Sequence, residues 1–183
     1  TARKMVGTAT KVAADVPGRL GYTSIAASAT LLVTEVVPRE LSPAVARVAL
    51  GGTRSDSLPW IPWTFGHFRT SRDGRKVAFA GWRVSVLDLT TRLHTDLVAP
   101  NDPPKLRRYP AWSPGDTAIA YVNPDPLQDT VMVGDVRTGR SRVPFTGSAG
   151  RRIVVTDWSA DGRFLAYELT AGNGATATEG WVY

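Results

Sequence analysis

Short runs of alternating apolar and polar residues, separated by turns rich in Gly, Asp and Pro, follow one another along the chain. This period of two predicts β-strands joined by tight turns. The clearest unit is 109–145, where dipeptides such as Thr138-Gly139 supply the positive φ that tight hairpins require. The pattern predicts a four-stranded antiparallel sheet with strands at Tyr109–Ser113, Thr117–Val122, Thr130–Val136 and Arg140–Phe145.

The same unit recurs. Three segments share one order: an aromatic residue, a small polar linker, an Asp/Gly turn and a strand that ends in apolar-Ala-aromatic. They begin at Phe68, Trp112 and Trp158, at spacings of 44 and 46 residues. A second marker, at Asp88 and then Asp135, recurs after 47 residues. Four strands in every ~40–50 residues, in sheets that cannot bury both faces alone, predict the blades of an all-β β-propeller.

Four blades are expected, over about 21–58, 67–98, 109–145 and 154–183, with the last one incomplete. The first is a degenerate copy, because it has the strand pattern without the Trp-Ser pair. Residues 1–20 are a lead-in that could contribute one closing strand near Lys4–Val12. A four-bladed ring closed by that strand is one possibility, and a fragment of a six- to eight-bladed ring is the favoured one. Self-association of two chains would also complete a ring.

The sequence Trp112-Ser113-Pro114-Gly115-Asp116, followed by Ile119-Ala120-Tyr121, resembles the TolB-like (WD-like) propeller repeat, whose core is Trp-Ser-Pro-Asp-Gly and then Ile-Ala-Phe. The resemblance covers about 68–183, with a weaker extension back to 22. It departs from the repeat at Phe68, at Gly115-Asp116 and at Ala160. It implies a propeller of the kind found in the protein-binding periplasmic TolB protein, in exported lipoproteins and in prolyl-oligopeptidase-like enzymes. With Thr rather than Met at position 1, it implies an extracytoplasmic (periplasmic, secreted or cell-surface) location.

Composition excludes several classes of function. The 22 basic and 16 acidic residues give a net charge of +6, but the basic residues are dispersed rather than gathered into the stripe typical of nucleic-acid binding. The absence of Cys excludes disulfides, thiolate zinc sites and a cysteine nucleophile. The longest apolar stretch, Ile25–Val37, is interrupted by polar residues and falls short of the ~20 residues of a membrane helix. Neither a nucleic-acid partner nor a membrane span is expected.

No catalytic or cofactor site is expected. The G-x-S-x-G, H-E-x-x-H and P-loop motifs do not occur. Asp73, Asp116 and Asp161 recur at one turn of each copy, and Asp bonds its own backbone in such turns. Oxygen donors in Asn123–Asp129 could hold calcium, but the prolines favour a rigid turn. We therefore expect no cofactor and no metal.

The candidate binding surface lies in the connections between blades. Aromatic residues and prolines crowd Leu58–Phe68, where the aromatics could fill gaps between blades or form a contact surface. The equivalent connections are predicted to carry Arg and Tyr, which are enriched at interface hot spots. The predicted partner-binding residues are Trp60, Trp63, His67, Arg107, Arg108, Tyr109, Arg151 and Arg152.

The sequence predicts a non-catalytic module that recognises a protein or peptide through these connections. The alternative is the gating propeller of a prolyl-oligopeptidase-like hydrolase whose catalytic domain lies outside this chain.

Overall fold

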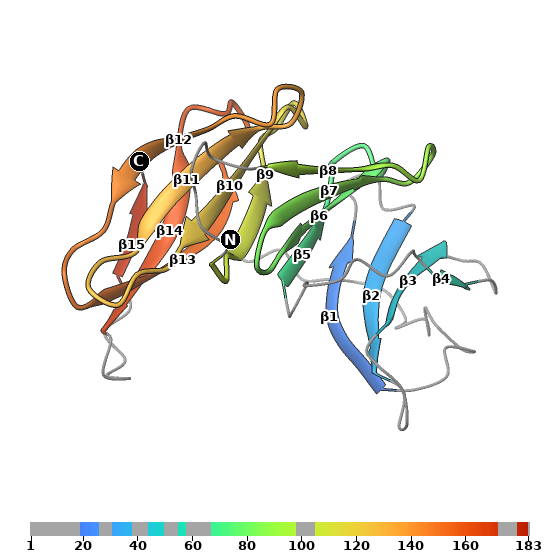
Figure 1. Ribbon diagram of the computed structural model, residues 1–183, viewed down its shortest axis with the longest axis horizontal. Coiled ribbons are helices and arrows are strands. Elements are labelled where there is room, and N and C mark those ends of the chain that lie inside the picture. The colour runs from blue at the N-terminus through green and yellow to red at the C-terminus, as the bar shows by residue number, and fades with distance from the viewer. Residues whose placement is uncertain are drawn as a thin grey trace, which may run out of the picture.

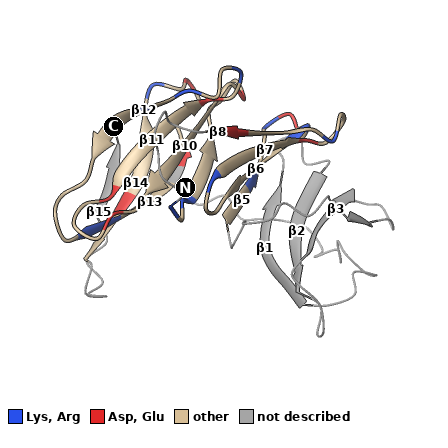
Figure 2. Cartoon of the chain, viewed as in Figure 1, with Lys and Arg blue, Asp and Glu red and all other residues tan. Residues whose placement is uncertain are grey.

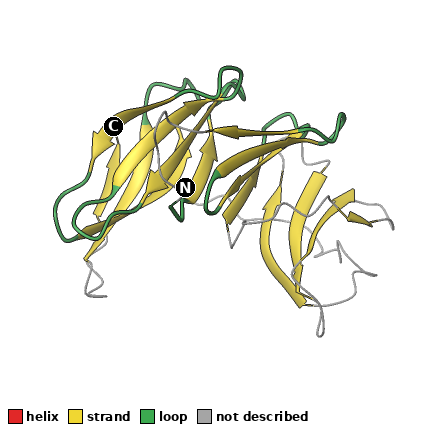
Figure 3. Ribbon diagram, viewed as in Figure 1, coloured by secondary structure: helices red, strands yellow, loops and turns green. Residues whose placement is uncertain are grey.

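The computed structural model describes residues 67–97 and 105–171, apart from the side chain of Thr156, and the backbone of strands 19–25, 31–37, 44–49, 55–57 and 179–182. All regular structure in this part of the chain is β-strand (Figure 3). It includes no helix long and apolar enough to cross a bilayer. The prediction of an all-β fold is confirmed.

The strands form four consecutive antiparallel sheets, the blades, which follow one another in chain order from one end of the molecule to the other (Figure 1). In each sheet the strands are neighbours in the order of the sequence. Blade 1 is β1 (Arg19–Ile25), β2 (Leu31–Val37), β3 (Ala44–Ala49) and β4 (Ser55–Ser57). Blade 2 is β5 (His67–Thr70), β6 (Lys76–Ala80), β7 (Val84–Asp88) and β8 (His94–Leu97). Blade 3 is β9 (Arg108–Trp112), β10 (Ala118–Asn123), β11 (Thr130–Asp135) and β12 (Ser141–Thr146), and blade 4 is β13 (Arg151–Trp158), β14 (Leu165–Ala171) and β15 (Glu179–Val182).

The predicted strands correspond to these elements with one notable difference. The first strand of blade 4 begins at Arg151, upstream of the predicted start at 154. Arg151 and Arg152 therefore lie in a strand and pair with Ala171 and Thr170, rather than lying in a connection. Likewise Arg108 and Tyr109 belong to β9.

The first strands of the blades lie next to one another, in the order β1, β5, β9 and β13. The remaining strands of each sheet succeed one another away from this inner edge. Consecutive blades thus stack face to face, which is how propellers bury sheets that have two apolar faces.

Apolar side chains fill the space between blades. Ala78 and Ala80 of blade 2 pack with Ile119 and Tyr121 of blade 3 in one core cluster. Four consecutive residues of β10, 119–122, are buried, because β10 has a blade on each side. In β14 burial alternates instead, with Tyr167 among the residues packed against blade 3. The continuous buried runs of β6 and β10 follow from this sandwiched position.

Each repeated Trp joins its blade to the preceding one. The indole Nε1 of Trp112 donates to the carbonyl oxygen of Arg69 at 2.9 Å, and that of Trp158 donates to the carbonyl oxygen of Ala111 at 3.1 Å. In blades 3 and 4 the Trp of the repeat therefore joins neighbouring blades. In blade 2 this position is held by Thr70, which pairs with Val77 as Trp112 pairs with Ile119 and Trp158 with Leu165. The predicted alignment of Phe68 with the two Trp residues is therefore wrong by two residues, and Phe68 pairs with Phe79 instead.

The recurring Asp residues organise turns, as predicted, with one exception. Asp73 accepts from the Ser71 hydroxyl and from the amide of Arg75, and Asp161 accepts from the equivalent groups of blade 4. Burial opposes ionisation of Asp73, but these hydrogen bonds and nearby cations outweigh it and lower the pKa of its carboxyl.

Asp116 is the exception, because its carboxylate bonds outside its own turn. Its two oxygens accept the backbone amides of Arg72 at 2.8 Å and Asp73 at 3.0 Å, in blade 2. In this blade the usual Asp-Gly order of the turn is reversed to Gly115-Asp116. Asp116 therefore occupies the turn position that Gly74 has in blade 2, and its φ is positive, 53° compared with 73° for Gly74. Asp116 thus takes the left-handed position of its turn, as predicted, but its carboxylate bonds to the neighbouring blade rather than to its own backbone.

Candidate functional site

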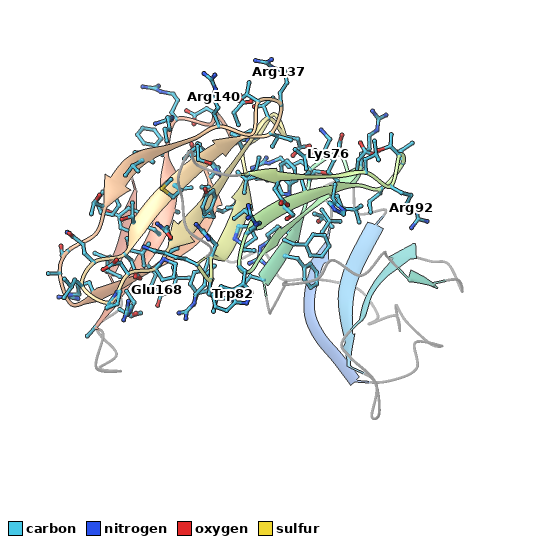
Figure 4. All side chains as sticks on the ribbon, viewed as in Figure 1. Lys76, Trp82, Arg92, Arg137, Arg140 and Glu168 are labelled. Carbon is cyan, nitrogen blue, oxygen red and sulfur yellow. The ribbon has the colours of Figure 1, made fainter. Side chains whose placement is uncertain are left out.

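The blades have two ends. At one end, the connection face, lie the hairpins between second and third strands, 81–83 and 124–129, and the connections between blades, 105–107 and 147–150. At the other end, the turn face, lie the turns between first and second and between third and fourth strands. Figure 4 shows Trp82 at the connection face and Arg92, Arg137 and Arg140 at the opposite edge. Basic residues occur at both ends (Figure 2), so charge alone does not distinguish a binding face.

Arg107 supports the connection face from within. Its side chain is only 4% exposed, and its Nη1 donates to the carbonyl oxygens of Trp82 at 2.7 Å and Lys105 at 2.6 Å. Its backbone amide also donates to the carbonyl of Gly81. The predicted place of Arg107 on an exposed contact surface is therefore wrong, because the carbonyls of the 81–83 hairpin need buried donors and a guanidinium supplies several.

Arg152 makes a similar link between blades 3 and 4. Its Nη1 donates to the carbonyl of Asp125 at 2.8 Å and to the carboxylate of Asp129 at 3.0 Å. The side chain of Arg152 is 44% exposed, whereas that of Asp129 is 4% exposed. Arg152 therefore combines a structural ion pair with a solvent-facing part.

In the 123–129 loop, the carboxylate of Asp129 bonds to other groups of the protein. The oxygens of Asp129 accept from the amides of Asp125 and Ile153 in addition to Arg152, so they are already occupied. Among the residues that the structure describes, no group of three or more His, Cys, Asp or Glu side chains could hold a metal.

His67 and Tyr109 meet where blades 2 and 3 adjoin. Their rings lie 4.5 Å apart between centroids at an angle of 56°. Tyr109 has a φ of 55°, unusual for a bulky residue, and stands at an irregularity in the pairing of β9 with β10. Burial, followed by the charges of Arg108 and Arg69, lowers the pKa of the His67 imidazole. The structure thus brings together His67, Arg108 and Tyr109, three of the predicted residues.

Arg151 lies at the start of β13, on the connection face, with its side chain partly buried. Its Nη1 is buried and has no hydrogen-bond acceptor in the described part of the chain. Trp60 and Trp63 lie outside the described residues.

Two exposed apolar side chains of this face were not among the predicted residues. Trp82 is 44% exposed in the hairpin of blade 2, and Leu127 is 77% exposed in the loop of blade 3. The signal for Trp82 is present in the sequence, because Gly81-Trp82-Arg83 separates two short apolar strands. An aromatic residue at the tip of a hairpin cannot pack within its own sheet, which makes it a candidate contact residue.

No protein-family model and no curated protein matches this chain. Solved structures do match: the putative TolB from Agrobacterium tumefaciens superposes with a TM-score of 0.69 at 15% identity, over 90% of this chain and 58% of the other. TolB from Acinetobacter baumannii gives a TM-score of 0.70 at 16% identity, over 90% and 41%.

The fold is that of a TolB-like β-propeller. A prolyl endopeptidase structure also matches, with a TM-score of 0.64 at 16% identity, over 92% of this chain and 28% of that one. The chain spans less than two thirds of the length of each of these three structures. The resemblance noted in the sequence is confirmed at the level of fold. Because TolB-like propellers occur both in enzymes and in proteins that are not enzymes, function has to be argued from the connection face.

Proposed function

We propose that the chain is a non-catalytic binding module that recognises a protein or peptide through the connection face. The observation that carries this proposal is Trp82, an aromatic side chain that is 44% exposed although the backbone beneath it is held by the buried Arg107. Exposed aromatics on rigid supports bind with little loss of conformational entropy, and Trp, Tyr and Arg dominate interface hot spots.

The surroundings of Trp82 support the same function. His67 pairs in the sheet with Ala80, two residues before Trp82, and its ring contacts that of Tyr109. Arg108 lies between the buried Arg107 and Tyr109 along the chain. The proposed contact set is therefore Trp82, His67, Arg108, Tyr109, Arg151 and Arg152, with Arg107 as its internal support.

Selection from a displayed random-peptide library tests this proposal, because it works without a known partner. Peptides enriched on the purified chain are expected to bind at least about tenfold more weakly to Trp82→Ala, since truncating an aromatic hot spot commonly costs more than about 1 kcal/mol. The matched control is Leu93→Ala, because Leu93 is 70% exposed on the turn face. Unchanged affinity for Trp82→Ala, or an equal loss for Leu93→Ala, would contradict the proposal.

A second candidate function is the gating propeller of a prolyl-oligopeptidase-like hydrolase, which the match to a prolyl endopeptidase structure favours. The coding sequence on either side of residues 1–183 decides between the two. A G-x-S-x-G motif in a following α/β domain would favour the hydrolase. Peptidase activity of the full-length protein, lost when that Ser is replaced by Ala, would establish it.

We also propose that the protein works outside the cytoplasm, in the periplasm, at the cell surface or as a secreted protein. The resemblance of its repeat to TolB-like proteins supports this location. Recovery of the native protein with cytoplasmic enzymes after cell fractionation would contradict it.

A further inference from the structure

Three basic side chains gather at the inner edge of the molecule, between blades 2 and 3. His67 and Arg69 occupy alternate positions of β5, on either side of the buried Phe68, and so project from the same face of the strand. Arg108 opens β9, the strand next to β5. We call His67, Arg69 and Arg108 the inner basic cluster.

The two arginines of the cluster are accessible to a ligand. Arg69 is exposed and Arg108 is partly buried. Neither forms an ion pair with any residue that the structure describes. Two carboxylates of the connection face are taken by other cations, since Asp125 lies 3.8 Å from Lys105 and Asp129 lies 3.0 Å from Arg152. Neighbouring like charges repel, and a bound anion would relieve that repulsion.

The backbone holds an aromatic wall beside the cluster at an energetic cost. Tyr109 adopts a φ of 55° although it precedes Pro110, and proline disfavours helical conformations of the residue before it. In this conformation the ring of Tyr109 makes a tilted contact with that of His67. Backbone strain of this kind concentrates at binding and catalytic sites, where the surrounding structure maintains it.

We propose that the inner basic cluster binds a carboxylate group of the peptide or protein partner, with Arg108 as the principal donor. A guanidinium binds a carboxylate through two parallel hydrogen bonds, a geometry that lysine cannot provide. Two guanidinium groups and an imidazole at one position suit a single anionic group, whereas a nucleic acid needs a row of cations along its backbone. This inference rests on the proposed function and specifies its partner: an acidic peptide segment.

The probe that tests it is a fluorescein-labelled hexaglutamate peptide, followed by fluorescence anisotropy at low salt. Arg108→Gln and Arg69→Gln are expected to weaken binding about tenfold, the size of effect seen when one charge-assisted hydrogen-bonding partner is removed. The matched control is Arg137→Gln, in an exposed turn of the opposite face, with an expected change below about twofold. Circular dichroism and thermal unfolding check that each variant is folded.

Several outcomes would overturn the inference. They are no binding of hexaglutamate by the wild-type chain, equal losses for Arg108→Gln and Arg137→Gln, and equal binding of a hexalysine peptide. A six-nucleotide oligothymidylate that binds more tightly than hexaglutamate, and depends on Arg108, would assign the cluster to phosphate instead.

The experiments distinguish failure of the carboxylate site from failure of the proposed peptide-binding function. If selected peptides depend on Trp82 but carry no acidic residues and bind Arg108→Gln normally, the binding module stands and the carboxylate site is wrong. If hexaglutamate depends on Arg108 while no peptide depends on Trp82, the anion site stands and the peptide-binding face is wrong.

Discussion

At the scale of single residues, the two consecutive arginines before Tyr109 have opposite roles. Arg107 is buried and donates to backbone carbonyls, whereas Arg108 is partly exposed and has no ion pair within the described part of the chain. Composition alone predicts exposure for both, because arginine is rarely buried unless it is paired. Arg107 is buried because it donates to the carbonyl oxygens of Trp82 and Lys105. Trp82 lies 25 positions before Arg107, so this hydrogen bond cannot be deduced from the local sequence.

Arg107→Gln should therefore destabilise the chain by about 2–3 kcal/mol, since it leaves buried carbonyl oxygens without their charged donor. Urea unfolding measures the change in the free energy of unfolding. Arg83→Gln, an exposed change in the same hairpin, serves as the control and should alter it by less than about 0.5 kcal/mol. Equal stability of the two variants would show that Arg107 does not support the hairpin.

Two further features of single residues were not predicted: the backbone conformation of Tyr109 and the exposed position of Trp82. A residue before proline is expected in an extended conformation, so the positive φ of Tyr109 and its contact with His67 had no signal in the sequence. Trp82 did have one, in its place between two apolar strands, but the concentration of aromatics at 58–68 is the stronger pattern and favoured that segment.

At the scale of elements, the strand pattern was largely predictable because alternation and turn dipeptides recur at one period, although Phe68 lies two residues before the position of the Trp marker. The start of β13 was not, since Arg151-Arg152 has the composition of a loop. A first strand forms the inner edge of its blade, so one of its sides is not covered by another sheet. Charged side chains are tolerated on that side. The Asp-Gly turns were predicted correctly at Asp73 and Asp161, but the reversed pair at Gly115-Asp116 concealed a bond between blades.

Asp116→Ala should accelerate hydrogen exchange at the amides of Arg72 and Asp73, which lie in a different blade and lose their acceptors. Exchange measured by NMR resolves these two sites individually. Asp161→Ala is the matched control, because the bonds of Asp161 remain within its own turn and its loss should leave exchange at Arg72 and Asp73 unchanged. If Asp116→Ala does not affect those two amides, the carboxylate does not join the blades.

At the scale of the whole molecule, stacking of blades explains both stability and the location of the site. The clusters between blades 2 and 3 and between blades 3 and 4 form separate apolar layers, so each blade depends on its neighbours. The same stacking brings first strands together at the inner edge, where basic and aromatic side chains from β5 and β9 meet. The fold could thus be predicted from a repeat, whereas the site depends on which side chains adjoin across blades.

The central claim, that a peptide binds the connection face, is tested most directly by NMR mapping. A selected peptide, or hexaglutamate, is titrated into the isotope-labelled chain, and shifts of backbone amide and indole signals are followed. The account predicts saturable changes at His67, Trp82, Arg108 and Tyr109, with Leu93 and Arg137 on the turn face unaffected. Changes concentrated on the turn face, or spread evenly over both ends of the blades, would contradict it.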